Sequence, residues 1–420
     1  MKIYLLIFSL VLHVPSGGSI GAALDSARAE FRSSGEGTTI YIAPGTYYEE
    51  LTIDIPAVRL INASFTPSVA LYDGGVRADE NAVRISWYCG HGYQYRSMGE
   101  QFNYGGRRVR RWNASVLVTA PDFYAENIIF ENSFNQYISP AELLDSLYDI
   151  SQAKVDWTDK ERPKRVMPTR PREAFSTAVQ YSMYNERASA LSLTSDAKRT
   201  ILKGCRVVGH QDALYGDHGA SLRIEGGVVQ GTVDYIFGGM DVTAENVELV
   251  IGDSYGGKQC YIAAGRGYVA DTKRVENVSE RSVAENVSER SVVENGTQHG
   301  TLAQASLSAS GTSSLSASGT SSLSASGTSS DSISTPFGKV PADEVAEQGM
   351  IFRRCVVRYA TTDEVKSPTK PLVYLARPWR WWGTHLFEET DTRNVNIHPD
   401  TISLGLTKGH PAPFVKITDF

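Results

Sequence analysis

The sequence lacks the signatures of the commonest hydrolases and metal-binding domains. It has only four cysteines, Cys89, Cys205, Cys260 and Cys355, and no two of them have the C-x-x-C spacing of a zinc ribbon or a thioredoxin-type site. The eight histidines include no H-E-x-x-H motif, and there is no G-x-S-x-G motif. A disulfide is compatible with the four cysteines, but their spacing determines no pairing. The commonest zinc and serine hydrolases are therefore excluded.

The chain also lacks an excess of positive charge and long apolar runs. Among its 420 residues, 41 are basic and 47 acidic, which gives a net charge of −6 and excludes a generic nucleic-acid binder. No apolar stretch reaches the ~20 residues that span a bilayer. The apolar content of 41% and the 37 glycines are typical of a globular protein. We therefore expect neither nucleic acid nor a membrane as a partner.

The N-terminal residues have the pattern of a secretory leader. In residues 1–12 (MKIYLLIFSLVL) a lysine is followed by a short apolar run, and the small residues at 16–18 could follow a cleavage point. We interpret residues 1–17 as a signal peptide and expect the protein to be secreted to the extracellular space or cell wall. The alternative is a buried first strand. Five sequons agree with a secreted glycoprotein: Asn62, Asn113, Asn277, Asn286 and Asn295.

Residues 272–335 differ in composition from the rest of the chain. VENVSERS at residue 275 recurs as AENVSERS at residue 284, and SLSASGTS occurs three times in tandem from residue 306. Such Ser/Gly/Ala repeats cannot bury enough apolar surface to offset the entropy of ordering. The pattern predicts a disordered insertion within one domain, which is formed by residues 18–271 and 336–420.

The remaining chain repeats short β-branched segments at intervals near 20 residues. Aligning Cys205, Gly227 and Asn246 gives steps of 22 and 19 residues, and Cys355 falls in the same column. A repeat made only of strands and turns is typical of a parallel β-helix, in which each coil buries its inner face against its neighbours. A β-sandwich is the alternative. Helical periodicity in residues 22–34 predicts a helix that caps one end.

The 22-residue step has a chemical consequence. Asp212 and Asp234 are 22 residues apart, so on adjacent coils their carboxyl groups should stack about 4.8 Å apart. Two carboxylates this close cannot both ionise easily, so one keeps a proton while the other acts as nucleophile or base. Gln211 supplies an amide donor, and Arg187, 24 residues before it, should lie one coil away. This set of groups is suited to cleaving an ester.

Three motifs around these residues resemble those of the pectin methylesterases. Residues 211–215 (QDALY) resemble the Q-D-T-L-Y motif of that family, residues 231–238 (GTVDYIFG) its G-T-V-D-F-I-F-G, and residues 375–379 (LARPW) its L-G-R-P-W. The three motifs occur in the family's order. The resemblance covers most of residues 19–395, and it is interrupted by the repeat insertion and by residues 137–186.

The resemblance implies an all-β fold, a right-handed parallel β-helix, that hydrolyses the methyl esters of galacturonate in pectin. It implies a monomer that needs no metal or cofactor. Asp234 would attack the ester, Gln211 would stabilise the oxyanion, Asp212 would act as acid and then base, and Arg377 would orient Asp234. The residues expected to contact the substrate are Trp379, Arg187, Tyr215 and Tyr235.

The sequence departs from the family pattern at three positions. Arg187 stands where the family has the glutamine of Q-A-V-A-L, and it could donate to an oxyanion, pair with Asp234 or block the site. Ala213 and Ala376 replace a threonine and a glycine. Two other functions therefore stay open: a weakened or inactive carbohydrate-binding protein, and a thioesterase on the same scaffold. A pectate lyase is not favoured, because the matching motifs include no acidic cluster for calcium.

Overall fold

The structure is a computed structural model with two compact units. The larger unit comprises Met1–Trp157, Glu161–Tyr268 and Ala346–Phe420, and the smaller comprises Thr158–Lys160 and Val269–Val345. The residues that it describes are 10–90, 93, 95–98, 114–145, 169–180, 187–252, 259–265, 332–335, 338–341, 349–377, 385–399 and 415–418.

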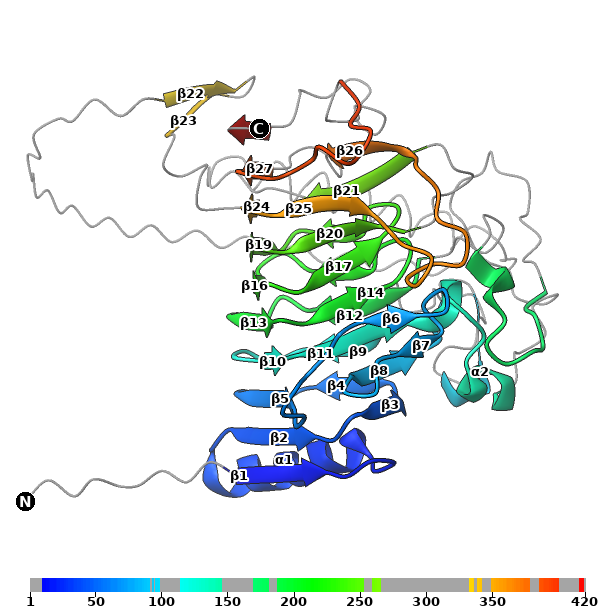
Figure 1. The fold of residues 1–420 in the computed structure, drawn as a ribbon. Helices are drawn as coiled ribbons and strands as arrows, with labels where there is room; N and C mark the ends of the chain where they lie inside the picture. Colours follow the sequence, from blue (N-terminus) through cyan, green and yellow to red (C-terminus); the bar gives the residue numbers. More distant parts are fainter. Residues whose placement is uncertain are drawn as a thin grey trace, which may run out of the picture. The chain divides into compact units, whose positions relative to one another are not determined.

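Three sheets of parallel strands form the larger unit, and their strands stack as rungs (Figure 1). The first sheet contains, in spatial order, β1 (Leu10–Val14), β2 (Thr38–Ile42), β5 (Val58–Asn62), β10 (Tyr124–Glu126), β13 (Thr200–Lys203), β16 (Ser221–Glu225), β19 (Asp241–Glu245), β24 (Met350–Arg353), β27 (His385–Glu388) and β28 (Val415–Thr418). The second contains β3 (Gly45–Tyr48), β8 (Val83–Trp87), β11 (Ile128–Asn132), β14 (Arg206–Val208), β17 (Val228–Gly231), β20 (Glu248–Ile251) and β25 (Val356–Tyr359).

The third sheet completes each coil. It contains β4 (Leu51–Ile53), β9 (Ala114–Val118), β12 (Ser189–Leu193), β15 (Leu214–Gly216), β18 (Ile236–Gly238), β21 (Gln259–Gly265) and β26 (Leu372–Ala376). Successive coils therefore run through one strand of each sheet, as in β13, β14, β15 and then β16, β17, β18. The expected all-β parallel β-helix is confirmed. A single core lies inside it, built from inward aliphatic side chains such as Leu202, Val207 and Leu214.

Short additional elements lie outside the three sheets. They are the antiparallel pair β6 (Leu71–Tyr72) and β7 (Arg77–Ala78), the helix α2 (Pro140–Leu144), and the 3-10 helices η1 (Arg96–Met98), η3 (Ser133–Asn135) and η4 (Thr177–Gln180). Within the described part of the chain, no helix has the length and apolar character needed to cross a membrane.

Left-handed residues turn the chain from the first sheet into the second. In six coils the residue after the first strand has a positive φ between 49° and 63°: Asn127, Gly204, Gly226, Asn246, Arg354 and Glu389. Glycine and asparagine tolerate this conformation best, which explains why they punctuate the repeats.

The register corrects one detail of the sequence alignment. The pairing of Arg206 with Val228 and of Val228 with Glu248 places Cys205, Gly227, Val247 and Cys355 in one column. Asn246 instead occupies the left-handed position before this column, so the second step is 20 residues and not 19.

Helix α1 (Ile20–Ser34) caps the N-terminal end of the coils, as expected. Ser19 is its N-cap, and the carboxylate of Glu49 accepts hydrogen bonds from the backbone N–H groups of Ile20 (2.9 Å) and Gly21 (2.8 Å). The helix buries its apolar side chains, including Leu24, on β1 and β2. An acidic group at a helix N-terminus satisfies donors that have no partner within the helix.

Strand β1 occupies part of the expected leader. It pairs in parallel with β2, from Leu10 opposite Thr38 to Val14 opposite Ile42. Residues 10–14 thus form a strand in the full-length chain, and only Val14 of this strand is buried. Cleavage after residue 17 stays a prediction, and it would remove this strand.

Burial limits two covalent modifications that the sequence allows, disulfide bonds and N-glycosylation. All four cysteines are free and buried. The side chain of Asn62 is 5% exposed, and its Nδ2 donates to the carbonyl oxygens of Asn81 (2.8 Å) and Asn127 (3.3 Å). The Asn62 amide is therefore occupied in the folded chain, so this sequon adds no support for a secreted glycoprotein. The other four sequons lie outside the described residues.

In the smaller unit, the described residues form a hairpin. β22 (Ser332–Thr335) pairs with β23 (Gly338–Pro341) in antiparallel register. The expected insertion ended at residue 335, so its last four residues belong to this hairpin. Residues 272–331 lie outside the described residues, and their predicted disorder stays a prediction.

Candidate active site

Two stacked turns between the second and third sheets hold the carboxylate pair. Asp212 and Asp234 precede β15 and β18, whose residues Leu214 and Ile236 are register partners. Both aspartates have left-handed backbones, with φ of 55° and 49°. The N–H of Asp212 donates to the carbonyl of Val233 in the next coil (3.1 Å). The stacking expected from the 22-residue step is confirmed.

Burial raises the pKa of Asp212 above that of an ordinary aspartate. The two carboxyl groups are almost inaccessible, at 2% exposure for Asp212 and 5% for Asp234. Burial, and then the charge of Asp234, raise the pKa of Asp212 well above its usual value, against the opposing effects of Arg187, Arg377 and a hydrogen bond from Gln211. Burial and the neighbouring carboxylate therefore favour the protonated form of Asp212.

Arg377 stabilises the carboxylate form of Asp234. Its Nε donates to Oδ1 of Asp234 (2.5 Å), and its second donor, Nη2, bonds Oδ2. The backbone N–H of Arg377 donates to the carbonyl of Ala263 on β21, which fixes where the side chain starts (2.9 Å). Burial acts to lower the pKa of Arg377, but the charge and hydrogen bonds of Asp234 outweigh it and raise that pKa. Such a two-point pair is strong and directional.

Arg187 faces Asp212 and not Asp234. A parallel bridge joins Arg187 to Gln211, which confirms that the two lie one coil apart. The Nε of Arg187 is 3.6 Å from Oδ2 of Asp212, and its side chain is 35% exposed. The suggested pairing of Arg187 with Asp234 is therefore not observed. The two arginines of the site serve different carboxyl groups.

The aromatic residues expected near substrate divide into two groups. Tyr215 lies on the outer face of the third sheet, against Phe237, with ring centroids 5.6 Å apart. Tyr235 is fully buried (0% exposed) among core side chains, so the expectation that it contacts substrate is wrong. The outward equivalent of Tyr215 in the next coil is Phe237, its register partner. Trp379 lies outside the described residues.

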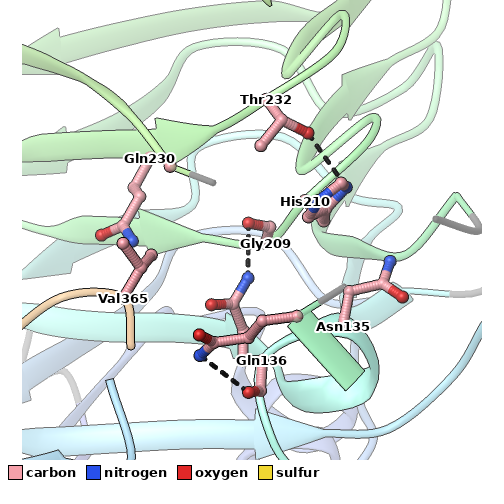
Figure 2. Close-up of a pocket in the computed structure, with 9 residues that line it drawn as sticks. Asn135, Gln136, Gly209, His210, Gln230, Thr232 and Val365 are labelled. Carbon is pink, nitrogen blue, oxygen red and sulfur yellow. Dashed lines mark hydrogen bonds between the residues drawn. The ribbon is translucent and has the colours of Figure 1, made fainter. Parts of the chain in front are cut away.

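Sequence reasoning missed a polar contact behind the carboxylates. His210 and Thr232 each precede one of the aspartates by two residues, and Nδ1 of His210 lies 2.9 Å from Oγ1 of Thr232 (Figure 2). The N–H of Thr232 also donates to the carbonyl of His210 (3.0 Å). The same 22-residue step that predicted the aspartate stack could have predicted this one. The contact ties the two turns together.

A small polar pocket of about 220 Å³, partly open to solvent, surrounds this contact. Its lining consists of Asn135, Gln136, Gln180, Gly209, His210, Gln230, Thr232, Gly252 and Val365. Figure 2 shows the amide of Gln136 donating to the carbonyl of Gly209 (2.7 Å), and the amide of Gln180 donates to Gln136 (2.9 Å). The lining holds no carboxylate, so the aspartate pair is the stronger candidate for chemistry. Among the described residues, no cluster of three or more His, Cys, Asp or Glu side chains has the arrangement of a metal site.

Comparison with known proteins gives the same family as the motifs. A family model described as Pectinesterase matches residues 176–282. This range contains Arg187, Gln211, Asp212 and Asp234. The chain is 32% identical over 100 residues to the probable pectinesterase/pectinesterase inhibitor 23 of Arabidopsis thaliana. That match covers 24% of this chain and 17% of the Arabidopsis protein. The chain therefore spans less than a fifth of the length of this relative. The resemblance to the pectin methylesterases is confirmed.

Solved structures of pectin methylesterases have lower sequence identity to this chain than the Arabidopsis protein has. The pectin methylesterase PemA from Erwinia chrysanthemi has a TM-score of 0.49 and 17% identity, with 94% of this chain and 81% of that chain covered. The pectin methylesterase from carrot has a TM-score of 0.45 and 13% identity, with 100% of this chain and 91% of that chain covered.

Proposed function

We propose that this protein is a carboxylic ester hydrolase that removes methyl esters from the galacturonate units of pectin and releases methanol. The observation that carries the proposal is the buried pair of Asp212 and Asp234, in which only Asp234 is bound at two points by an arginine. The match of the Pectinesterase family model to residues 176–282 supports it. In this proposal the carboxylates do the chemistry, and no metal or cofactor takes part.

In the first half-reaction, Asp234 attacks the carbonyl carbon of the ester. The carbonyl π electrons move to oxygen, and the amide of Gln211 stabilises the resulting oxyanion. When the carbonyl re-forms, the bond to the methoxy oxygen breaks. Asp212 gives its proton to that oxygen, so methanol leaves and an acyl-enzyme on Asp234 remains.

In the second half-reaction, Asp212 acts as a base. Now ionised, it takes a proton from a water molecule as the water oxygen attacks the acyl carbon. The bond to Asp234 breaks, the galacturonate acid is released, and both aspartates return to their starting states. A raised pKa at Asp212 suits both steps, because the group must lose and regain a proton within one cycle.

The contact between Arg187 and Asp212 favours a second candidate function. A cation 3.6 Å from the acid stabilises its ionised form, and so it lowers the fraction of Asp212 that holds the proton on which the mechanism depends. If this effect dominates, the protein is a weakened esterase that mainly binds carbohydrate. We further propose extracellular pectin as the partner and a monomer as the working unit.

Methanol release from methyl-esterified pectin tests the proposal. The wild type should release methanol, and Asp234→Asn should not, with both chains binding de-esterified pectin to a similar extent. Binding of pectin by both chains without methanol release would favour the carbohydrate-binding alternative. Hydrolysis of an acyl thioester with no release from pectin would instead indicate the thioesterase.

A further inference from the structure

Tyr261 contacts the arginine that binds the nucleophile. The guanidinium carbon of Arg377 lies over the Tyr261 ring, 4.0 Å from its centroid. Tyr261 is on β21, and Arg377 directly follows β26, the neighbouring strand in the third sheet. The two residues are therefore adjacent in space although 116 positions separate them in the sequence.

The contact with Tyr261 is separate from the hydrogen bonds of the ion pair. Asp234 accepts from Nε and Nη2, which lie on one edge of the planar guanidinium group. The central carbon of the group lies above the Tyr261 ring, where a cation is attracted to the ring electrons. Hydrogen bonds along one edge still allow the guanidinium to rotate about that edge. The attraction to the ring opposes this rotation, so the two contacts together restrict the orientation of the ion pair.

The ring of Tyr261 is itself held on two sides. It stacks on Tyr374 of β26, with centroids 5.0 Å apart and planes 15° apart, and Tyr374 stacks in turn on His398 (4.5 Å, 19°). The hydroxyl of Tyr261 donates to Oε1 of Gln259 (2.8 Å). A ring fixed at its face and at its hydroxyl can act as a rigid support.

We propose that Tyr261 is a positioning residue that fixes the orientation of Arg377 and, through it, of the Asp234 carboxylate. The inference rests on the proposed function, in which Asp234 is the nucleophile. A nucleophilic oxygen must approach the ester carbon along a narrow range of directions, so a tilted ion pair places fewer molecules in a reactive geometry. The effect therefore belongs in kcat and not in KM.

Two substitutions and a matched control test the role. Tyr261→Leu removes the ring, whereas Tyr261→Phe keeps it and removes only the hydroxyl. Tyr124→Leu is the control, because it removes a similar contact between Arg59 and a tyrosine ring (4.3 Å) from the first sheet. For methanol release we expect Tyr261→Leu to lower kcat about tenfold with KM within about twofold. Tyr261→Phe and the control should stay within about twofold of the wild type.

The division of the effect between kcat and KM separates positioning from a general loss of packing. A packing defect should appear equally in Tyr261→Leu and in Tyr124→Leu, whereas positioning lowers kcat in Tyr261→Leu alone. Nitrogen-15 NMR of the Arg377 Nε–H group, assigned with Arg377→Lys, needs no substrate. This group should be less ordered in Tyr261→Leu than in the wild type, and unchanged in Tyr124→Leu.

Three outcomes would overturn the inference. Unchanged kcat and an unchanged Arg377 signal in Tyr261→Leu would show that Tyr261 does not position Arg377. A raised KM with constant kcat would make Tyr261 a substrate contact. An equal loss of kcat in Tyr124→Leu would show that the effect is not specific to Tyr261. If the wild type releases no methanol, the proposed function fails, and the Arg377 signal still decides whether Tyr261 orients Arg377.

Discussion

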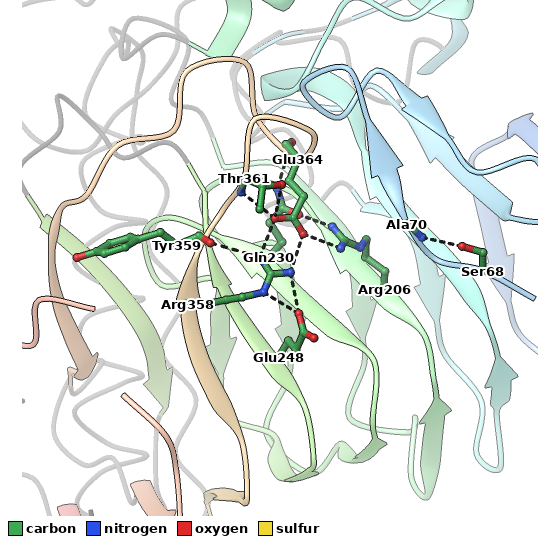
Figure 3. A network of polar contacts seen from close by, with 9 residues as sticks. All are labelled: Ser68, Ala70, Arg206, Gln230, Glu248, Arg358, Tyr359, Thr361 and Glu364. Atoms are coloured by element: carbon green, nitrogen blue, oxygen red, sulfur yellow. Dashed lines mark hydrogen bonds and ion pairs between the residues drawn. The ribbon is translucent and has the colours of Figure 1, made fainter. Parts of the chain in front are cut away.

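Among the clusters of buried carboxylates and arginines in the described residues, two differ clearly in their chemistry. The first is the candidate site around Asp212 and Asp234. The second lies outside the second sheet, where Glu364 is bound by two arginines (Figure 3). Arg206 donates to its Oε1 (2.8 Å), and Arg358 donates to both oxygens (2.7 and 2.8 Å). The side-chain oxygen of Gln230, on β17, accepts a hydrogen bond from Arg206 (2.7 Å).

Hydrogen bonds to the carboxylate account for the difference. Burial acts to raise the pKa of Glu364, but hydrogen bonds from Arg358 and Arg206, together with the backbone N–H of Thr361, outweigh it and lower the pKa to about 2. Asp212 is buried as deeply, but its facing arginine is 3.6 Å away and a second carboxylate is beside it, so its pKa moves up. In one cluster the arginines favour the ionised form of the carboxyl group, and in the other burial and a second carboxylate favour the protonated form.

The largest effect should come from Asp234→Asn. The substitution keeps the side-chain volume but removes the nucleophile, so methanol release should fall by at least about 10³-fold while the circular dichroism spectrum stays unchanged. Activity within about tenfold of the wild type would remove Asp234 from the role of nucleophile.

Asp212→Asn should be nearly as severe. Asparagine cannot give a proton to methoxide or take one from water, and such help is typically worth 10² to 10⁴-fold in kcat. The measurement is again methanol release, with KM expected to stay within about threefold. An unaltered kcat would show that the carboxylate pair does not work as a unit.

Glu364→Gln should destabilise the protein without changing kcat. It leaves the buried Arg206 without its ionic partner, which costs about 3 kcal/mol in the free energy of unfolding. Glu248→Gln is the matched control, because Glu248 binds Arg358 from an exposed position and should cost about 1 kcal/mol or less. Urea unfolding of the two variants at pH 7 measures the difference.

The pH dependence of that stability has a definite sign. The pKa of Glu364 is lower in the folded chain than the usual 4.5 of the unfolded one, so the folded state favours the ionised form. Its contribution is fully present above about pH 4.5 and is lost as the pH falls towards 2. Glu364→Gln should flatten the stability profile in this window, and equal slopes in both proteins would contradict the assignment.

Local repetition explains how much of the fold and site could be predicted from the sequence. The 22-residue step from Cys205 to Gly227 is a property of two adjacent coils without an insertion, so it predicted both the β-helix and the stacking of Asp212 on Asp234. It could not predict that Tyr261 lies beside Arg377. The repeat segment lies between these two residues in the sequence, so their separation is not a multiple of the coil length. The family resemblance supplied Arg377, whereas it marked residues 260–266, which include Tyr261, only as a core strand.

Backbone conformation explains the error at Tyr235. In a strand, side chains alternate between faces, and that rule places Tyr235 and Phe237 on the same side. Strand β18 begins only at Ile236, so Tyr235 still lies in the turn that contains the left-handed Asp234, where the alternation does not apply. Tyr235 and Ile236 both pack in the core, and Phe237 packs outside it. Ala213 and Tyr215 follow the same pattern after Asp212. A positive φ at a non-glycine residue is not readable from sequence alone.

Arg187→Gln tests how the facing arginine affects Asp212 in the candidate site. Arg187 acts to lower the pKa of Asp212, so its replacement should raise that pKa further and leave more of the acid protonated. We expect kcat for methanol release at pH 7 to rise about threefold, and the basic limb of the profile to move to higher pH. Arg187→Lys, which keeps the charge, is the control. A fall in kcat would show that the guanidinium has been recruited to the reaction.

The smallest effect should come from deleting residues 272–331 and joining the ends with a short Gly/Ser linker, which keeps the β22–β23 hairpin. The Ser/Gly/Ala repeats of this segment have no apolar period that could pack on a coil. Loop-closure entropy grows only logarithmically with loop length, so the deletion should raise the free energy of unfolding by about 1 kcal/mol or less. Methanol release and the response to Glu364→Gln should be the same in both backgrounds. Loss of activity in a deletion variant that still folds would show that the segment contributes to the site, and the single-domain organisation would then need revision.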